Sequence, residues 1–545
     1  MEIRPFDWHN KQPLAEHYVW DFSRVRHLYS YNPWNEADWK LRAQDLGKAG
    51  RLRADQAGLA RVLREYNRRM GNTERTLASL DALEEGKALV VIGGQQAGLF
   101  TGPMLVIHKA LSILKTAERA SAMLGRPVLP VFWIAGEDHD WDEVNHYYMM
   151  SRDGEPQKIR LHVAAETGKT SVSHVRIRPE EWRDALRELG AALADTEYKP
   201  RILEQLSAIH EASGSLSEAF ARIMTWLFGK HGLIVMDAAD PALRALEGEM
   251  FLRLLDDNEA LSGALMEAKA QVEGAGYRPQ AEVSAESAQL FVLDEGQRRL
   301  LVRAGNGAYR DKRGMREYSA GLLRDWAQNY PERLSTGALA RPIMQEYLFP
   351  VLATVLGPAE IAYWGLLRPA FELFGMNMPV IVPRTEFTLI EPGVRKTMDK
   401  FEFTFSDVVE RFEEIRTAWL KRQDRLGLDE RFARVKEEFQ KLYEPVLSAV
   451  SSIHDGMARI GQTNLRKIME QIDYLHARSV EAYQSRFDQG LRQLRKAEQS
   501  LLPLGKPQER VYNVLMYLNQ FGCAWLDEWI RSVPAADGRH YLIYC

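Results

Sequence analysis

Short, wholly apolar segments alternate with amphipathic segments along the first 390 residues. Apolar, β-branched runs occupy residues 88–92, 128–135, 233–237 and 378–383. Such runs are typical of strands buried on both faces of a parallel sheet. Helical periodicity follows three of them, at residues 103–117, from about residue 140, and at residues 242–256. The alternation predicts an α/β fold built on a doubly wound, mostly parallel sheet.

Other patterns surround this core. Residues 1–87 have a charged, helical pattern and are expected to form a helical lead-in to a core of residues 1–390. Strand-like patterns at 160–178 and 281–303 predict added β-structure, within insertions at about 150–180 and 275–345.

The pattern changes to long, charged helices from residue 391. Apolar residues recur at alternating intervals of three and four: Phe432, Val435, Phe439, Leu442, Val446, Ala449 and Ile453. This heptad spacing predicts an antiparallel, coiled-coil hairpin within residues 391–500, although Pro445 should kink its first helix. The tail, residues 501–545, is aromatic and is expected to dock on the core.

Composition narrows the function classes. The net charge of −4 argues against general binding to nucleic acid or to anionic membranes. No apolar run reaches the roughly 18 residues needed to span a bilayer. Two cysteines in 545 residues form no disulfide framework, so a cytoplasmic location is expected.

A glycine-rich loop, residues 93–102, joins the first apolar run to the helix expected at Pro103. Ligands bind where parallel strands end, and glycine lets them approach the backbone. Thr101 is expected to cap the helix, whose first N–H groups would face an anion. The loop matches no standard phosphate-binding motif. It is therefore either a ligand site or a turn that needs glycine for its geometry alone.

A second loop, residues 136–146, carries five carboxylates and two histidines. A helix starting near Asp140 would place His139, Asp142 or Glu143, and His146 on one face. Crowded carboxylates raise one another's pKa, which suits general base work. Proton transfer, a divalent-metal site and a dipole-stabilised helix start all remain open. Since the spacing matches no standard zinc motif, no metal is expected.

Several isolated polar residues lie in apolar surroundings. Glu346, Glu360 and Tyr363 should find polar partners or a ligand, because unpartnered burial is costly. Arg384 could pair with a carboxylate or a phosphate. His108 and Lys109, one to two turns into the first helix, are expected to be packed or solvated rather than to face a site.

Taken together, several motifs resemble one known family. They are Gly93–Pro103, Trp133–Asp140, Asn145–His146, Leu356–Trp364 and Gly505–Asn513. Because it carries these motifs in this order, the chain is similar to the cysteine ligases of bacillithiol biosynthesis. The resemblance implies a Rossmann-like core with connecting insertions and a C-terminal coiled coil. It also implies a homodimer through the coiled coil, a nucleotide site for ATP or ADP in the C-terminal region, and the joining of cysteine to glucosaminyl-malate.

The resemblance and the residues together suggest a mechanism. Amide formation needs an activated cysteine carboxylate, which the 93–102 loop would hold, while one of Asp138, His139 and Asp140 takes the amine proton. The expected substrate-binding residues are Gly94, Gln95, Gln96, Thr101, Gly102, Glu137, Asn145, His146, Glu360, Tyr363 and Arg384. The expected nucleotide-binding residues are Lys506, Gln508, Arg510, Tyr512 and Asn513, although a tail of this kind can simply dock. A coiled-coil interaction protein and a metal-dependent hydrolase are the alternative functions.

Overall fold

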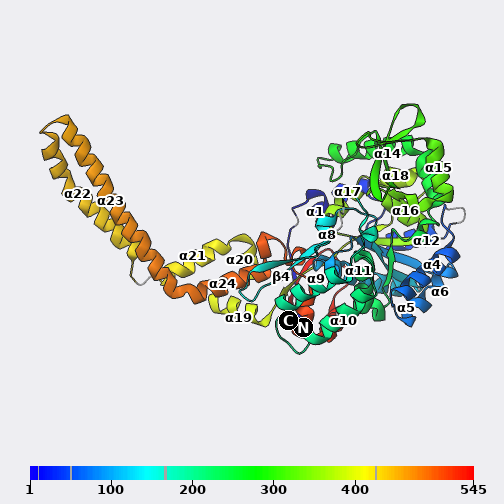
Figure 1. Cartoon of the computed structure of the whole chain (residues 1–545), viewed down its shortest axis with the longest axis horizontal. Coiled ribbons are helices and arrows are strands. Elements are labelled where there is room, and N and C mark those ends of the chain that lie inside the picture. Colours follow the sequence, from blue (N-terminus) through cyan, green and yellow to red (C-terminus); the bar gives the residue numbers. More distant parts are fainter. Residues whose placement is uncertain (10, 49–51, 165–167, 424–425) are drawn as a thin grey trace. The chain divides into compact units, whose positions relative to one another are not determined.

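The computed structural model of the protein divides into two compact units. The first contains residues 1–389 and 506–545, and the second contains residues 390–505. The structure describes residues 1–9, 11–48, 52–164, 168–423 and 426–545. Figure 1 shows sheets and helices in the first unit and the helices α19 to α24 in the second.

A five-stranded parallel sheet, in the order β13-β12-β2-β3-β6, forms the centre of the first unit. Its strands are β2 (Leu89–Gln95), β3 (Val128–Ile134), β6 (Ile234–Asp237), β12 (Val351–Leu356) and β13 (Val380–Pro383). Four of them are predicted by the apolar runs. The fifth, β12, was missed because all six of its residues are buried within a longer apolar region. Periodicity cannot distinguish such a strand from a buried helix.

The order of the strands locates the expected site. The chain passes from β2 to β3 and β6 on one side of the sheet, whereas β12 and β13 lie on the other side of β2. In open parallel sheets, ligands bind at the carboxyl ends of the strands, at the point where the strand order turns from one side of the sheet to the other. The loops after β2, β3 and β12 are therefore the relevant ones.

The helices of the first unit fall into those before β6 and those after β6 along the chain. Those before β6 are α1 (Pro13–Trp20), α2 (Phe22–Val25), α3 (Glu36–Leu46), α4 (Gln56–Arg69), α5 (Glu74–Ser79), α6 (Asp81–Glu84), α7 (Leu105–Leu124), α8 (Trp141–Val144), α9 (Pro179–Ala192), α10 (Lys199–Glu211) and α11 (Leu216–Phe228). Those after β6 are α12 (Pro241–Arg244), α13 (Gly248–Asp256), α14 (Asn258–Gly274), α15 (Ala320–Asn329), α16 (Arg341–Leu348), α17 (Pro358–Trp364), α18 (Arg368–Leu373), α25 (Val514–Phe521) and α26 (Cys523–Ser532). Among the described residues, no helix is long and apolar enough to cross a membrane.

A three-stranded sheet joins the two ends of the chain. Its order is β1-β15-β14, with β1 at Glu2–Phe6, β15 at His540–Tyr544 and β14 at Glu386–Ile390. Glu2 lies opposite Tyr544 in an antiparallel register. The strand β1 interrupts the helical pattern predicted for residues 1–87, because a five-residue strand gains its stability from a distant partner rather than from local sequence.

A second five-stranded sheet, β10-β9-β8-β7-β11, is built from residues 287–336. Its strands are β7 (Ser287–Asp294), β8 (Gln297–Arg303), β9 (Tyr309–Asp311), β10 (Glu317–Tyr318) and β11 (Leu334–Thr336). The strand pattern at 281–303 is therefore confirmed, but the one at 160–178 is largely wrong. The nearby strands are β4 (His146–Met150) and β5 (Pro156–Arg160). Val172, Val175 and Ile177 are buried without strand pairing, which accounts for the misleading alternation.

The second unit contains α19 (Pro392–Phe401), α20 (Phe405–Glu410), α21 (Phe412–Gln423), α22 (Leu428–Ser451), α23 (Asp455–Gln484) and α24 (Asp488–Leu501). The helices α22 and α23 lie side by side as a hairpin (Figure 1). Pro445 lies inside α22, which continues to Ser451 without a break.

Candidate functional site

The acidic loop after β3 is less helical than its sequence suggests. The helix α8 spans only Trp141–Val144, and His146 begins strand β4. The predicted helical face shared by His139, Glu143 and His146 is therefore wrong, because β4 and β5 pair directly after a single helical turn. Asp140 caps this turn by accepting a hydrogen bond from the Glu143 backbone N–H at 3.3 Å. For Asp140, the interpretation as a helix start is the correct one.

Two arginines hold the carboxylate of Asp138. Its Oδ1 accepts hydrogen bonds from Arg298 Nη1 at 3.0 Å and from Arg341 Nη2 at 2.8 Å, and its Oδ2 accepts one from Gln96 Nε2 at 3.3 Å. Burial alone would raise the pKa of Asp138, but the charges of Arg341 and Arg298 and the Gln96 hydrogen bond outweigh it and lower the pKa. Asp138 is therefore a fixed anion and a poor proton acceptor near neutral pH.

A network of buried ion pairs holds Arg341 in position beside Asp138. Glu137 accepts hydrogen bonds from Arg341 Nε and from Arg244 Nη2, each at 3.0 Å, and Arg244 also pairs with Glu247. Buried charges are tolerated only when paired and hydrogen-bonded, so acids and guanidinium groups alternate. The side chain of Glu137, which was expected to bind substrate, is used here to position Arg341.

Sequence reasoning did not find Arg298 or the role of Arg341. Arg298 lies on β8, where its Nε donates to Ser335 Oγ at 3.0 Å and its Nη2 donates to the Thr336 carbonyl at 2.9 Å. Its guanidinium carbon is 3.8 Å from the centroid of the Phe291 ring. Only the pairing of β7, β8 and β11 brings these groups to the loop after β3, so no local sequence signal could identify Arg298.

His139 lies beside this ion cluster and is half-buried. Burial is the largest cause that lowers its pKa, and the positive charges of Arg298 and Lys169 lower it further. Its Nδ1 is buried and has no hydrogen-bond partner among the described residues. A neutral imidazole with an unpaired ring nitrogen can accept a proton near pH 7.

The carboxyl end of β2 is tied to α17, the helix after β12, by a buried lysine. Lys109 Nζ donates to the Gly94 carbonyl at 2.6 Å, to Gln95 Oε1 at 3.2 Å and to Glu360 Oε2 at 2.7 Å. The same Glu360 oxygen accepts the Gly357 backbone N–H at 2.7 Å. Lys109 is packed, as expected, and its ammonium also joins the end of β2 to α17. Tyr363, one turn after Glu360, is close enough to Arg341 to interact electrostatically with it.

The start of α7 differs from the prediction. Thr101 does not cap the helix: it is buried with φ +79°, and the N-terminal cap is Met104. The Met104 N–H donates to the Tyr512 carbonyl at 2.8 Å, and Asn513 Nδ2 donates to the carbonyls of Phe100 and Gly102 at 2.8 and 2.6 Å. The tail covers the position where an anion was expected, and sequence could not foresee a contact across about 400 residues.

Other predicted site residues also hold the tail in place. Gln508 exchanges two hydrogen bonds with the backbone of Leu389, and Arg384 pairs with Glu509 and Glu386. Gln508, Tyr512 and Asn513 are buried, whereas Lys506 and Arg510 are exposed. Asn145 and His146 contact each other, with His146 Nδ1 3.1 Å from Asn145 Oδ1.

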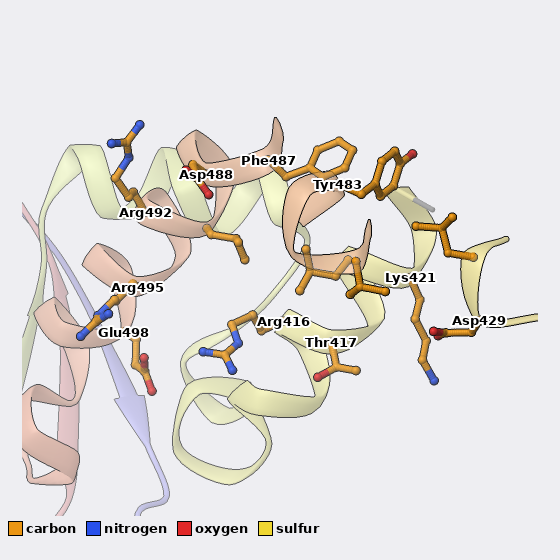
Figure 2. A pocket seen from close by; sticks show the side chains of 14 residues that line it. Arg416, Thr417, Lys421, Asp429, Tyr483, Phe487, Asp488, Arg492, Arg495 and Glu498 are labelled. Carbon is orange, nitrogen blue, oxygen red and sulfur yellow. The ribbon is translucent and has the colours of Figure 1, made fainter. Parts of the chain in front are cut away.

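A separate cavity of about 650 Å³ lies within the second unit. Figure 2 shows Arg416, Arg492 and Arg495 toward one end of it and Tyr483 and Phe487 toward the other. All of its lining residues belong to α21 to α24 or their connections, so it contains none of the strand-end residues. Among the described residues, no group of three or more His, Cys, Asp or Glu side chains is arranged to hold a metal ion.

Comparison with known proteins identifies the family. Residues 1–385 match the model described as "Bacillithiol biosynthesis BshC, N-terminal Rossmann-like domain". Residues 387–545 match "Bacillithiol biosynthesis BshC, C-terminal coiled-coil domain". The chain belongs to the BshC family. This assignment confirms the resemblance and the predicted fold class of a Rossmann-like core with a C-terminal coiled coil.

Relatives match over almost their whole length. A protein of Geobacillus sp. (strain WCH70) is 33% identical over 548 residues and covers 100% of both chains. One of Symbiobacterium thermophilum is 33% identical over 97% of this chain and 96% of its own. One of Bacillus cytotoxicus is 33% identical over 98% of each. Each is named "Putative cysteine ligase BshC", and the prediction of an enzyme of the ligase class is confirmed.

Proposed function

We propose that this protein joins cysteine to the amine of glucosaminyl-malate through an amide bond, as the last step of bacillithiol biosynthesis. The observation that carries the proposal is the presence of a fixed anion, Asp138, next to a neutral histidine, His139, in the loop at the carboxyl end of β3. Relatives named as cysteine ligases match the chain from end to end, which supports the choice of substrates.

The two residues have different roles in this reaction. The ionised Asp138 binds the acceptor amine or the cysteine ammonium by charge, because its low pKa keeps it deprotonated. As the amine nitrogen attacks the activated cysteine carbonyl, a C–N bond forms and the amine loses a proton to the neutral imidazole of His139. The bond between the carbonyl carbon and its leaving oxygen then breaks. Of the three candidate bases, Asp138 is held by two arginines and Asp140 caps α8, whereas the lowered pKa of His139 keeps its imidazole neutral.

A nucleotide, ATP or ADP, is proposed to bind in the cavity of the second unit. Its volume is within the range of small-molecule sites. Guanidinium groups of Arg416, Arg492 and Arg495 would contact phosphates, while Tyr483 and Phe487 offer apolar ring surface to the base (Figure 2). Calorimetric titration with ADP should show binding, and Arg492→Glu should weaken this binding at least about tenfold. An unchanged dissociation constant would mean that the nucleotide binds elsewhere. The exposed Lys506 and Arg510 would then be the next candidates.

We also propose a homodimer through the hairpin. Val435, Leu442 and Val446 on α22 remain 49%, 75% and 50% exposed after α22 and α23 have paired, and Ile453, just after α22, remains 66% exposed. Apolar residues that recur at heptad spacing and stay exposed are suited to cover a second copy of the hairpin. We also propose a cytoplasmic location, which fits a chain whose two cysteines, Cys523 and Cys545, form no disulfide.

Mass spectrometry tests the reaction directly. Purified protein is incubated with cysteine, glucosaminyl-malate and ATP, and each component is omitted in turn. Bacillithiol formed only when all three are present supports an ATP-dependent ligase. Product formed without ATP would require a different activated form of cysteine. No product under any condition would contradict the proposed reaction for the isolated protein.

A further inference from the structure

Residues 168–174 pack along the loop after β3. The backbone N–H groups of Val172 and Ser173 donate to the carbonyls of Asp138 and Gly136, at 2.8 and 3.0 Å. The Arg298 backbone N–H donates to the Lys169 carbonyl at 2.9 Å. Three parts of the chain therefore form one wall: the loop after β3, the 168–174 segment and strand β8. Lys169 is the residue that connects the segment to the strand.

Positive charge gathers around Lys169. The neighbouring cations are Arg299, Lys312 and Arg313, and the nearby acid that acts on Lys169 is Asp311. Asp311 is already engaged, because its Oδ2 lies 3.3 Å from Arg299 Nη1 and its Oδ1 accepts two backbone N–H groups. Lys312 has an exposed partner, Glu282, at 3.7 Å. Among the described residues, no carboxylate lies within salt-bridge distance of Lys169 or Arg313.

The excess of positive charge around Lys169 is unfavourable, and a bound anion would reduce it. Burial is the largest cause that lowers the pKa of Lys169, and the charges of Arg313, Arg299 and Lys312 lower it further. The positive charge of Lys169 also acts on the loop after β3, because it helps to lower the pKa of His139. An anionic group bound beside Lys169 would restore the balance of charge within reach of His139.

We propose that Lys169, assisted by Arg313, binds the carboxylates of the acceptor substrate and so selects a dicarboxylate-bearing amine. This inference rests on the proposed function and deepens it, since it assigns the acidic part of the acceptor to residues outside the Asp138 cluster. The amine of the acceptor faces His139, and its acidic part faces Lys169. The side chain of Lys169 thereby sets specificity and takes no part in the chemical step.

Charge reversal at Lys169 tests this assignment. For Lys169→Glu we expect kcat/KM with glucosaminyl-malate, divided by kcat/KM with methyl glucosaminide, to fall at least about tenfold relative to wild type. Methyl glucosaminide offers the same amine without carboxylates. The KM for cysteine stays unchanged, and Lys169→Arg retains most of the ratio. Lys40→Glu, an exposed lysine on α3, is the matched control for added charge.

Other results would overturn the inference. An unchanged ratio in Lys169→Glu would show that the carboxylates bind elsewhere. A selective rise in the KM for ATP would assign the cluster to phosphate instead. Equal losses with both acceptors, with a lowered melting temperature, would make Lys169 structural.

Direct binding separates this inference from the proposed function. Calorimetric titration of glucosaminyl-malate into wild type and Lys169→Glu needs no turnover. Binding to wild type that is lost in Lys169→Glu supports the inference even if no ligation occurs, in which case only the proposed reaction fails. Equal binding to both proteins, or binding to neither, overturns the inference.

Discussion

Arg298 Nη1 donates a 3.0 Å hydrogen bond to Asp138 Oδ1 across 160 residues of sequence. The first residue belongs to the second sheet and the second to a loop of the central sheet. Because Arg298 is itself held by Ser335, Thr336 and Phe291, it fixes the carboxylate in both position and charge. The second sheet is therefore part of the site.

Replacing Asp138 by Asn should remove the fixed negative charge while keeping the size of the side chain. We expect kcat to fall by about 100-fold or more, the loss typical of a removed electrostatic group in a buried site. Steady-state kinetics monitored by mass spectrometry would measure it. The matched control is Asp195→Asn, an exposed aspartate whose side chain is 77% accessible. Activity of Asp138→Asn close to that of the control would refute the role of Asp138.

Removing the side chains of the proposed site should not affect dimerisation. Asp138→Ala combined with His139→Ala should abolish turnover and leave the protein dimeric, because both residues lie in the first unit and the proposed dimer contact is in the second. Size-exclusion chromatography with light scattering would verify the mass. Retained turnover in this double variant would rule out the assigned site.

Activity should decline on the acid side as His139 becomes protonated. Its pKa in the folded protein is lowered below the usual 6.5, so the neutral, proton-accepting form predominates above that value. We expect the acid limb of the kcat/KM profile to lie below pH 6.5. Lys169→Glu should shift this limb to higher pH, since a positive charge near the imidazole is replaced by a negative one. A profile that is identical in His139→Gln would exclude His139 as its source.

Leu442→Glu should convert the protein to a monomer. Leu442 is 75% exposed on α22, so the change costs the isolated hairpin little, yet it places a charge in the proposed apolar contact. Sedimentation velocity would compare this variant with Gln440→Glu, which adds the same charge about 200° away around the helix. An unchanged dimer in Leu442→Glu, or a wild-type monomer, would contradict the proposed interface.

The buried pair of Arg384 and Glu509 should stabilise the docking of the tail. Both guanidinium–carboxylate contacts measure 2.6 Å, and both residues are almost fully buried. Arg384→Ala leaves the buried carboxylate of Glu509 without its guanidinium partner and, among the described residues, with only the His108 ring nitrogen, 2.6 Å away, as a side-chain contact. This loss should cost about 3–5 kcal/mol of unfolding free energy in urea titrations. Arg434→Ala, which breaks an exposed pair with Glu438, should leave the midpoint unchanged. Equal midpoints for the two variants would mean that the buried pair does not hold the tail.

Local pattern was sufficient for much of the fold. The apolar runs predict β2, β3, β6 and β13 because a strand buried on both faces must be apolar throughout, whatever its partners. The apolar spacing predicts the helices α22 and α23 because helical periodicity depends on residues a few positions apart. The predicted seam is wrong at Leu442 and Val446, which stay exposed after the two helices pair. The same reasoning placed Asp138 and His139 at a strand end, where parallel sheets bind ligands.

Contacts between distant segments decided the rest. Strand β1 forms because Glu2–Phe6 pairs with His540–Tyr544, and Thr101 fails as a cap because the tail reaches the start of α7. Asp138 becomes a fixed anion rather than a proton acceptor only when Arg298 and Arg341 arrive from other parts of the chain. The sequence by itself determined which residues could form strands, helices and a charged loop, because those preferences are local. Only the tertiary structure decided the charge state and role of each group, because pKa depends on burial and on neighbours that the linear order does not reveal.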